Sequence, residues 1–316
     1  MRTVIQNIVF IAIGFLMLML GAQWLVDGAS TFARKYHIPE IIIGLTIVSI
    51  GTSMPELMVS LTSAISGHAD ISIGNVIGSN LCNLMLILGL TSLIVPLVFS
   101  KTTKKYDIPI MIASTILVFI VANLDATISR FDGLILSAVF ICFIVYTIKL
   151  AKKSMTDLKN SDTNVTKKDI LISFFKVVLG ILLLKYGADI SVDNAVSVAT
   201  ILGVSEKVIG VTIVAIGTSL PELITSVVAG IKGEIDIAIG NIVGSNIFNL
   251  LFILGASSII SPIAYSLSYN TEFILLIIVS FLLLVFANFG KKNTMTRFNG
   301  LLYLLIYSGY MASLIL

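Results

Sequence analysis

The sequence predicts an all-α membrane protein with ten transmembrane helices, arranged as two inverted repeats of five helices in which helices 2 and 7 are broken. Three observations predict this fold. The 316 residues are 57% apolar and only 12% charged, about half the charged share of a soluble domain. The apolar residues come in runs close to the roughly 20 residues that cross a bilayer as a helix. The chain also matches itself after a shift of 166 residues.

The self-match is strongest between residues 44–89 and 210–255, where 27 of 46 aligned positions are identical without a gap. Shared hydrophobicity would not keep Gly, Pro, Asn and Glu in register, so the pattern indicates an internal duplication. Because each half holds an odd number of spans, the second half enters the membrane from the opposite side. Inverted repeats with interrupted helices are typical of transporters, whose sites lie near the bilayer midplane.

The charged residues set the predicted boundaries and orientation. The first repeat covers residues 1–151 and the second covers residues 170–316, and the polar segment 152–169 is predicted to be a cytoplasmic linker. Ten spans with both termini outside place about 15 of the 20 Lys and Arg residues on the cytoplasmic side, as the positive-inside rule expects. We therefore expect a multi-pass protein of the cell membrane with both termini extracytoplasmic.

The motif Gly51-Thr52-Ser53-Met54-Pro55-Glu56 predicts a helix break, which Gly217 and Pro221 repeat in the second half. Pro55 cannot donate an N–H to the carbonyl of Gly51, and its ring crowds that carbonyl. Gly51 would let the backbone take a strained conformation. Carbonyls freed around Ser49–Thr52 would cost several kcal/mol each in hydrocarbon unless something binds them, and a dehydrated cation can do so.

A glutamate follows each break, and Glu56 and Glu222 are the only acids that we place deep within the most apolar spans. A carboxylate at mid-membrane costs about 2.5–3.5 kcal/mol on insertion scales, so such a residue indicates function. Inverted symmetry would bring the two glutamates together at the centre. There they repel each other unless a cation lies between them.

The helix after each break supplies neutral oxygen atoms. In GNVIGSNLCN, Asn75, Ser79 and Asn83 recur every four residues and share one helix face. Gly74 and Gly78 form a GxxxG pair, which predicts a close approach to the broken helix. The second copy, GNIVGSNIFN, repeats these residues as Asn241, Ser245, Asn249, Gly240 and Gly244.

All these groups are hard oxygen donors, which suit Ca²⁺ or Na⁺ and argue against zinc or copper. Some also have a structural interpretation. Hydroxyls beside each break can cap the resumed helix, as for Thr52, Ser53, Thr218 and Ser219. Four amides can equally brace the helix pair, namely Asn75, Asn241, Asn80 and Asn246.

Other charges in the spans receive structural interpretations. Lys185 lies four residues before Asp189, which predicts an i,i+4 ion pair rather than a transport role. Asp27 and Asp193 match each other across the repeats and are expected near span ends.

With the motifs GTSMPE…GNVIGSNLCN and GTSLPE…GNIVGSNIFN, the sequence resembles the cation/calcium exchanger superfamily, and within it the sodium/calcium exchangers of prokaryotic size. The resemblance covers both motif-bearing repeats and so essentially the whole chain. It implies antiport by alternating access, in which Ca²⁺ moves against Na⁺. By motif position, it implies that Glu56 and Glu222 bind Ca²⁺ and also take part in the Na⁺ sites.

The resemblance also implies further ligands. Carbonyls of Thr52 and Thr218 match the family's calcium site. The flanking sodium sites match the carbonyls of Ser49 and Ala215 and the hydroxyls of Ser53, Ser219, Ser79 and Ser245, and the central polar pair matches Asn83 and Asn249. By family analogy, the long spans Ile5–Ala33 and Ile170–Thr200 are expected to slide against the rest of the protein.

Both central positions are Asn here, whereas many relatives carry an aspartate at one of them, and an acid there is linked to K⁺ in potassium-dependent exchangers. The site then holds two formal negative charges, which neutralise one Ca²⁺ or two Na⁺. A third Na⁺, as the family's usual stoichiometry implies, leaves a net positive charge. The sequence therefore predicts K⁺-independent, electrogenic exchange.

The nearest alternative is a proton/calcium antiporter of the same superfamily, in which the two glutamates carry protons. That branch typically has a further acid after the break, where this chain has Ile77-Gly78-Ser79 and Val243-Gly244-Ser245. A cation channel is a second alternative, but a pore does not require helix breaks. We expect no enzymatic activity, cofactor, nucleic acid or obligate protein partner, so the expected partners are the two ions and the lipid bilayer.

Overall fold

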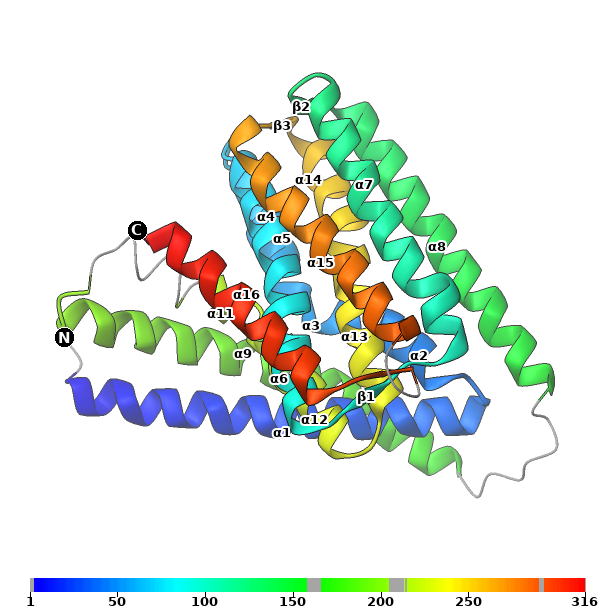
Figure 1. Ribbon diagram of the computed structural model, residues 1–316. Helices are drawn as coiled ribbons and strands as arrows, with labels where there is room; N and C mark the ends of the chain where they lie inside the picture. Colours follow the sequence, from blue (N-terminus) through cyan, green and yellow to red (C-terminus); the bar gives the residue numbers. More distant parts are fainter. Residues whose placement is uncertain (1–2, 158–165, 205–212, 214, 290–292, 316) are drawn as a thin grey trace.

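The protein is almost entirely helical in the computed structural model, which describes residues 3–157, 166–204, 213, 215–289 and 293–315 (Figure 1). Within these residues, seven helices are long and apolar enough to cross a membrane, and an eighth span is formed if a bent helix pair counts as one. These seven are Val4–Tyr36, Ile71–Ile94, Thr103–Leu124, Arg130–Lys152, Lys168–Ile201, Ile235–Ile260 and Leu267–Phe289.

The first half begins with one long helix, α1 (Val4–Tyr36), followed by the bent pair. The bent pair comprises α2 (Glu40–Ile43), the π-helical η1 (Gly44–Val48), α3 (Ser49–Thr52) and α4 (Met54–Ile65). After it come α5 (Asp70–Leu81), the π-helical η2 (Cys82–Ile87), α6 (Leu88–Ile94), β1 (Leu97–Val98), η3 (Thr103–Asp107), α7 (Ile108–Leu124), β2 (Thr127–Ile128) and α8 (Arg130–Asp157).

The second half repeats this order, starting from the long helix α9 (Lys167–Ile201). Its broken segment is α11 (Ala215–Gly217) and α12 (Leu220–Ile231). The remaining elements are α13 (Ile235–Ile247), the π-helical η5 (Phe248–Ile253), α14 (Leu254–Ile260), β3 (Ile263–Ala264), η6 (Leu267–Tyr269), α15 (Asn270–Phe289), β4 (Thr294–Met295) and α16 (Arg297–Ile315).

Helices cover both ends of the segment that the sequence assigns to a linker. α8 runs on to Asp157, and α9 already begins at Lys167. The start of α9 is fixed by a capping box, in which the Thr166 hydroxyl accepts the Asp169 N–H and the Asp169 carboxylate accepts the Thr166 N–H. The predicted boundaries at 152 and 169 therefore fall inside helices. The residues between these two helix ends, 158–165, lie outside the described residues.

Two short antiparallel ribbons join the halves, although the sequence predicts helices only. β1 pairs with β4 and β2 pairs with β3. These strands belong to chain reversals between helices, where backbone groups need partners that a helix no longer provides. The two ribbons lie at opposite ends of the molecule in Figure 1.

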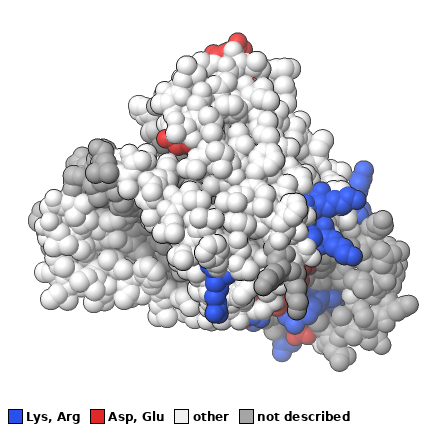
Figure 2. Space-filling model, in the orientation of Figure 1, with Lys and Arg blue, Asp and Glu red and all other residues white. Residues whose placement is uncertain are grey.

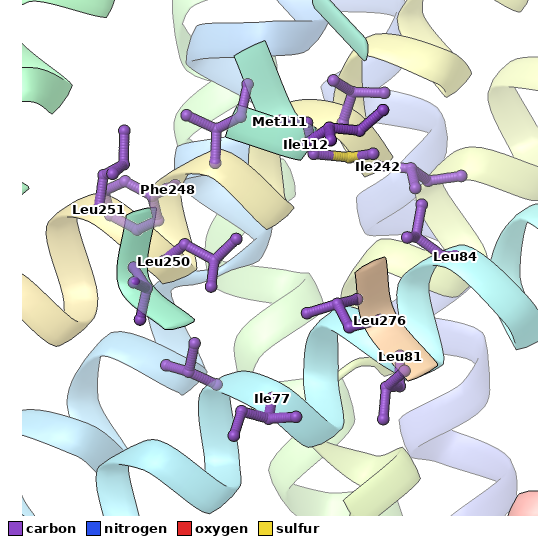
Figure 3. Packing of buried hydrophobic residues seen from close by; sticks show 14 of the residues in the cluster. Ile77, Leu81, Leu84, Met111, Ile112, Ile242, Phe248, Leu250, Leu251 and Leu276 are labelled. Carbon is purple, nitrogen blue, oxygen red and sulfur yellow. The ribbon is translucent and has the colours of Figure 1, made fainter. Parts of the chain in front are cut away.

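Burial differs sharply among the long helices. The most apolar window of Ile235–Ile260 is 94% buried and that of Ile71–Ile94 is 72% buried, whereas α1 and α9 reach only 22% and 28%. Figure 3 shows the core around the two buried helices, with side chains from α5, α7, η5 and α15 in contact with one another. These two helices carry the GNxxGSN motifs.

Helices α1 and α9 pack against each other along glycines. A Cβ atom on Gly14 would lie 2.7 Å from the Gly187 carbonyl oxygen, and one on Gly21 would lie 2.8 Å from that of Gly180. Only glycine allows the two backbones to approach this closely. Figure 1 shows this pair running across the other helices, along one side of the molecule.

Candidate cation-binding site

The first helix break lies at Ser53, between α3 and α4, and bends the pair by 49°. Ser53 has φ −83° and ψ 12°, and Pro55 stands in the first turn of α4. The second break has the same form, with Ser219 at φ −90° and ψ 7° and Pro221 in the first turn of α12. Proline fits the first turn, where no intrahelical N–H is required, so each break ends one helix and starts the next.

The predicted role of the break glycines is wrong. Gly51 is an ordinary residue of α3 rather than a strained one, and its missing side chain makes room for α9, because a Cβ atom would lie 2.6 Å from Ile181 Cδ1. Gly217 makes room in the same way for Val192 Cγ2, at 2.4 Å. Both glycines therefore serve the close approach of α9.

The prediction that the break frees the Ser49 carbonyl is also wrong. This oxygen accepts the Ser53 N–H at 3.0 Å and lies 3.4 Å from the Ser245 hydroxyl. A single helical turn closes before the break and keeps this carbonyl satisfied. The matching segment of the second half lies largely outside the described residues, and nothing is described of the Ala215 side chain.

Glu56 and Glu222 belong to one buried polar network, and each is fully buried. Ser53 donates to Glu222 Oε1 at 2.7 Å, and Ser219 donates to Glu56 Oε1 at 3.4 Å. Each break serine therefore reaches the glutamate of the other half. Ser79 adds a longer contact to Glu56 Oε1, at 3.5 Å, and Ser245 Oγ lies 2.8 Å from Ser53 Oγ.

Four asparagines cross-link the two buried helices at the centre. Asn83 donates to Asn246 Oδ1 at 3.0 Å, and Asn249 donates to Asn80 Oδ1 at 3.1 Å. Asn80 also donates to the backbone carbonyl of Asn246 at 3.2 Å. Asn83 and Asn249 stand where η2 and η5 widen into π-helical turns, a local geometry often found at functional sites.

Four buried side-chain oxygen atoms of these two clusters have no hydrogen-bond partner among the described residues. They are Glu56 Oε2, Glu222 Oε2, Asn83 Oδ1 and Asn249 Oδ1. Buried polar atoms are almost always paired, so an orphan set calls for an explanation such as an ion. The amides of both asparagines already donate elsewhere, so their free atoms are acceptors, the type that a cation requires.

Other predicted residues brace the site. Asn75 donates to Ser60 Oγ at 3.0 Å and to the Glu56 carbonyl at 3.2 Å. Asn241 makes the matching bonds to Ser226 Oγ at 2.9 Å and the Glu222 carbonyl at 3.4 Å. These amides fix the helix that presents each glutamate.

The two break threonines differ in their surroundings. Thr52 is fully buried and donates to Asn241 Oδ1 at 2.9 Å. Thr218 instead lines a cavity of about 180 Å³ together with Pro55 and Gly217.

Ser60 and Ser226 are site residues that the motifs do not predict. They lie four residues after the two glutamates and match each other across the repeat, and this match is the only signal of them in the sequence. Both are fully buried and accept an asparagine N–H.

Three of the four packing glycines contact the other half, but the predicted approach of Gly74 and Gly78 to the broken helix is not found among the described residues. A Cβ on Gly240 would lie 2.9 Å from Gly44 Cα, and one on Gly244 would lie 2.6 Å from Ser49 Oγ. Helix α13 thus packs against the broken helix of the other half. A Cβ on Gly74 would instead meet the Tyr269 hydroxyl at 3.2 Å, whereas Gly78 has no neighbour within 4 Å in the described part of the chain.

The donor set is carboxylate and neutral oxygen. Within the residues that the structure describes, no three His, Cys, Asp or Glu side chains gather closely enough to hold a metal ion. A cation here would rely on two carboxylates supplemented by amide, hydroxyl and carbonyl oxygens, the ligands that Ca²⁺ accepts.

Known proteins resemble this chain in both sequence and fold. The family model described as sodium/calcium exchanger protein matches residues 6–149 and 172–316. A putative antiporter, CaxA, from Alkalimonas amylolytica is 36% identical over 96% of each chain. The sodium/calcium exchanger MaX1 from Methanosarcina acetivorans is 31% identical over 98% of each chain.

A solved structure of the sodium-calcium exchanger NCX_Mj, soaked with zero Na⁺ and Ca²⁺, superimposes with a TM-score of 0.86 at 32% identity. It covers 99% of this chain and 100% of its own. Together, the family model and these relatives show that the chain belongs to the sodium/calcium exchanger family.

Proposed function

We propose that this chain exchanges Ca²⁺ for Na⁺ across the membrane, at one midplane site that holds either ion between Glu56 and Glu222. The observation that carries the proposal is the set of four buried, unpartnered oxygens on two glutamates and two asparagines. Two ionised carboxylates with only hydroxyl donors beside them and no positive charge are costly in a dry interior. A bound cation would offset that cost and satisfy the amide oxygens as well.

Exchange follows from competition for the same carboxylates. Because Na⁺ and Ca²⁺ both need Glu56 and Glu222, occupancy by one excludes the other. An empty site would leave two facing charges with no water, since both side chains are fully buried. This state resists the movement of the site across the apolar barrier. The site therefore opens to the other side of the membrane only when ions are bound.

The charge count gives the expected electrical behaviour. Two carboxylates neutralise one Ca²⁺, whereas three Na⁺ would add one net positive charge to the same site. The transport of three Na⁺ per Ca²⁺ is therefore electrogenic. With Asn at both central positions, 83 and 249, the site has no additional acid to attract K⁺, so we propose K⁺-independent exchange.

The remaining ligands are proposed from position and family. Hydroxyls of Ser53, Ser79, Ser219 and Ser245 lie in the same network as the glutamates. The carbonyls of Thr52, Thr218, Ser49 and Ala215 are proposed by resemblance. The Ser49 carbonyl already accepts the Ser53 N–H and lies within reach of the Thr52 and Ser245 hydroxyls, so it would have to give up one of these hydrogen bonds to contact an ion.

We further propose ten spans in two inverted repeats. The α12 segment with the residues before it, and the 19-residue α16, would add two spans to the eight above. Reciprocal contacts support the symmetry. Under a two-fold axis, each contact between the halves has a partner contact, made by the two residues that lie 166 positions away in the other half. Ser53–Glu222 and Ser219–Glu56 form such a pair, as do Gly14–Gly187 and Gly21–Gly180.

The proposed orientation places the linker in the cytoplasm and both termini on the opposite face of the cell membrane. In Figure 2, Lys and Arg gather on the lower and right-hand parts of the molecule, with a few acidic atoms among them, while the charged atoms visible at the top are acidic. A basic surface at one end agrees with the positive-inside rule.

Counter-ion dependence tests the function. Purified protein in proteoliposomes would be assayed for uptake of radiolabelled Ca²⁺ under an outward Na⁺ gradient, with the pH gradient collapsed. We expect uptake that responds to membrane voltage and is unchanged when K⁺ replaces choline on both sides.

Uptake driven only by a proton gradient would contradict the proposal in favour of a proton/calcium antiporter. Uptake with no counter-ion gradient would indicate a channel. A requirement for K⁺ would overturn the ion assignment while leaving exchange intact.

A further inference from the structure

An ion pair ties the α1–α9 pair to the core at one end of the molecule. On α1, Asp27 Oδ1 accepts the ammonium of Lys232, which stands at the C-terminal end of α12. The same ammonium lies 3.4 Å from the Gln23 carbonyl oxygen. Lys176 of α9 adds a looser contact, 3.9 Å from Asp27 Oδ2. Asp27 is thus held by α9 and by α12 at once.

This ion pair lies toward the end of α1 that leads to Tyr36, near the start of α9 and the linker segment. We call this side the linker face, defined by Tyr36, Asp157 and Lys167. On the opposite face, a cavity of about 640 Å³ is lined by Asp193 and Thr200, among others. The smaller cavity beside Thr218 also includes Asp193 and reaches the second break from that face.

The repeat does not duplicate the ion pair. Shifting by 166 residues matches Asp27 with Asp193, but it matches Lys232 with Ser66 and Lys176 with Phe10. Serine and phenylalanine cannot supply a positive charge. A mirror-image state, in which the opposite face closes, could therefore bring Asp193 to Ser66 but could not form the equivalent ion pair.

We propose that Asp27 and Lys232 are a positioning pair that holds the linker face closed and so biases the exchanger toward the state open on the opposite face. This inference rests on the proposed alternating-access function. If the two halves were equivalent, inverted symmetry would give the two states equal stability. The ion pair adds stabilisation to one of them, because a displacement of α1 relative to α12 separates its charges.

The expected size of the bias is modest. The Asp27 and Lys232 side chains are 42% and 30% exposed, and half-exposed ion pairs change an equilibrium by about two- to five-fold. The contact of Lys176 with Asp27 should not contribute, because α1 and α9 are expected to move together. Lys176 is therefore a control with the same charge and the same partner.

The test uses full-length protein in sided proteoliposomes and compares Lys232→Gln with Lys176→Gln. We expect Lys232→Gln to change the ratio of half-saturating Ca²⁺ at the two faces by about two- to five-fold, with affinity rising at the linker face. Lys176→Gln should leave the ratio unchanged. The charge swap Asp27→Lys with Lys232→Asp should restore the wild-type ratio.

A second readout does not need transport. Met58 lines the smaller cavity and can be changed to Cys in a Cys142→Ser background, since Cys142 is exposed and Cys82 is buried. A membrane-impermeant thiol reagent from the opposite face should modify Met58→Cys more slowly when Lys232→Gln is added. If wild-type vesicles show no exchange, the proposed function fails while this readout still tests the ion pair.

Equal shifts for Lys232→Gln and Lys176→Gln would overturn the inference, as would a charge swap that leaves the ratio altered. If Lys232→Gln does not insert into the membrane, Asp27→Asn takes its place, with the same expected shift. An unchanged ratio in Asp27→Asn would equally overturn the inference.

Discussion

The helices that carry the GNxxGSN motifs and the α1–α9 pair are similarly apolar but lie in different surroundings. The windows of the two motif helices are 94% and 72% buried, against 22% and 28% for α1 and α9. The buried helices direct their polar groups at each other through Asn80, Asn83, Asn246 and Asn249. The exposed pair meets through glycines and is tied to the core by an ion pair at its end.

This difference separates two tasks. A fixed binding site needs polar groups whose positions are determined by many mutual hydrogen bonds. We propose that the α1–α9 pair moves against the core, and the Asp27–Lys232 ion pair is the polar link that this movement would break.

The largest effect is expected from neutralising either core glutamate. Glu56→Gln or Glu222→Gln should lower Ca²⁺ exchange by about 100-fold or more, because a dry site then loses half of its negative charge. Both variants should remain folded, since glutamine preserves shape. Radiolabelled Ca²⁺ uptake in proteoliposomes measures the effect, with Glu234→Gln as a control. Normal exchange in either variant would remove the site assignment.

A smaller effect is expected from the break serines, and it should be unequal. Ser53 donates to Glu222 at 2.7 Å, whereas Ser219 donates to Glu56 at 3.4 Å. Because hydrogen bonds to charged groups contribute about 1.5–3 kcal/mol, Ser53→Ala should raise the half-saturating Ca²⁺ concentration about ten-fold. Ser219→Ala should raise it less. The reverse order would show that the two halves are not arranged as described.

Glycine substitutions compare the core with the α1–α9 pair directly. Gly244→Ala in the core and Gly21→Ala in α1 each place a Cβ within 3 Å of fixed atoms, so both should lower stability by about 1–3 kcal/mol. Gly244→Ala should also weaken Ca²⁺ binding, whereas Gly21→Ala should slow exchange with binding intact.

Gly309→Ala is the control for this comparison, because a Cβ there has nothing within 4 Å in the described part of the chain. It should be neutral or slightly stabilising. Thermal unfolding and Ca²⁺ binding in detergent check all three variants. Equal loss of Ca²⁺ binding in the Gly244 and Gly21 variants would contradict the proposed difference between the core and the α1–α9 pair.

The smallest effect is expected from K⁺. Replacing K⁺ by choline should change wild-type Ca²⁺ exchange by less than about two-fold, because no third carboxylate is present at position 83 or 249 to hold K⁺. Asn249→Asp adds such a carboxylate and should introduce a dependence on K⁺. A wild-type protein that already requires K⁺ would contradict the charge count.

Several features could be predicted because a local sequence pattern encodes them. The repeated Pro55 and Pro221 predict both helix breaks, which the structure places two residues earlier, at Ser53 and Ser219. The i,i+4 spacing predicts the Lys185–Asp189 ion pair, which has a separation of 2.8 Å. In each case the cause is local, so a few neighbouring residues suffice.

Contacts between the halves could not be predicted in the same way. A duplication shows which residues are equivalent, but not that Gly244 packs on Ser49 of the other half. The function of Gly51 was misassigned because the side chain that requires its small size, Ile181, is distant in sequence. The cross-linking of Asn83 with Asn246 likewise depends on how the two halves dock.

We propose that two glutamates, one from each half, form one cation site. Equilibrium binding of radiolabelled Ca²⁺ to purified protein is the decisive measurement, in wild type, Glu56→Gln and Glu222→Gln, with and without Na⁺. We expect one Ca²⁺ per wild-type chain, released by Na⁺, and loss of high-affinity binding in both variants. Two independent Ca²⁺ sites, or binding that survives either substitution, would contradict it.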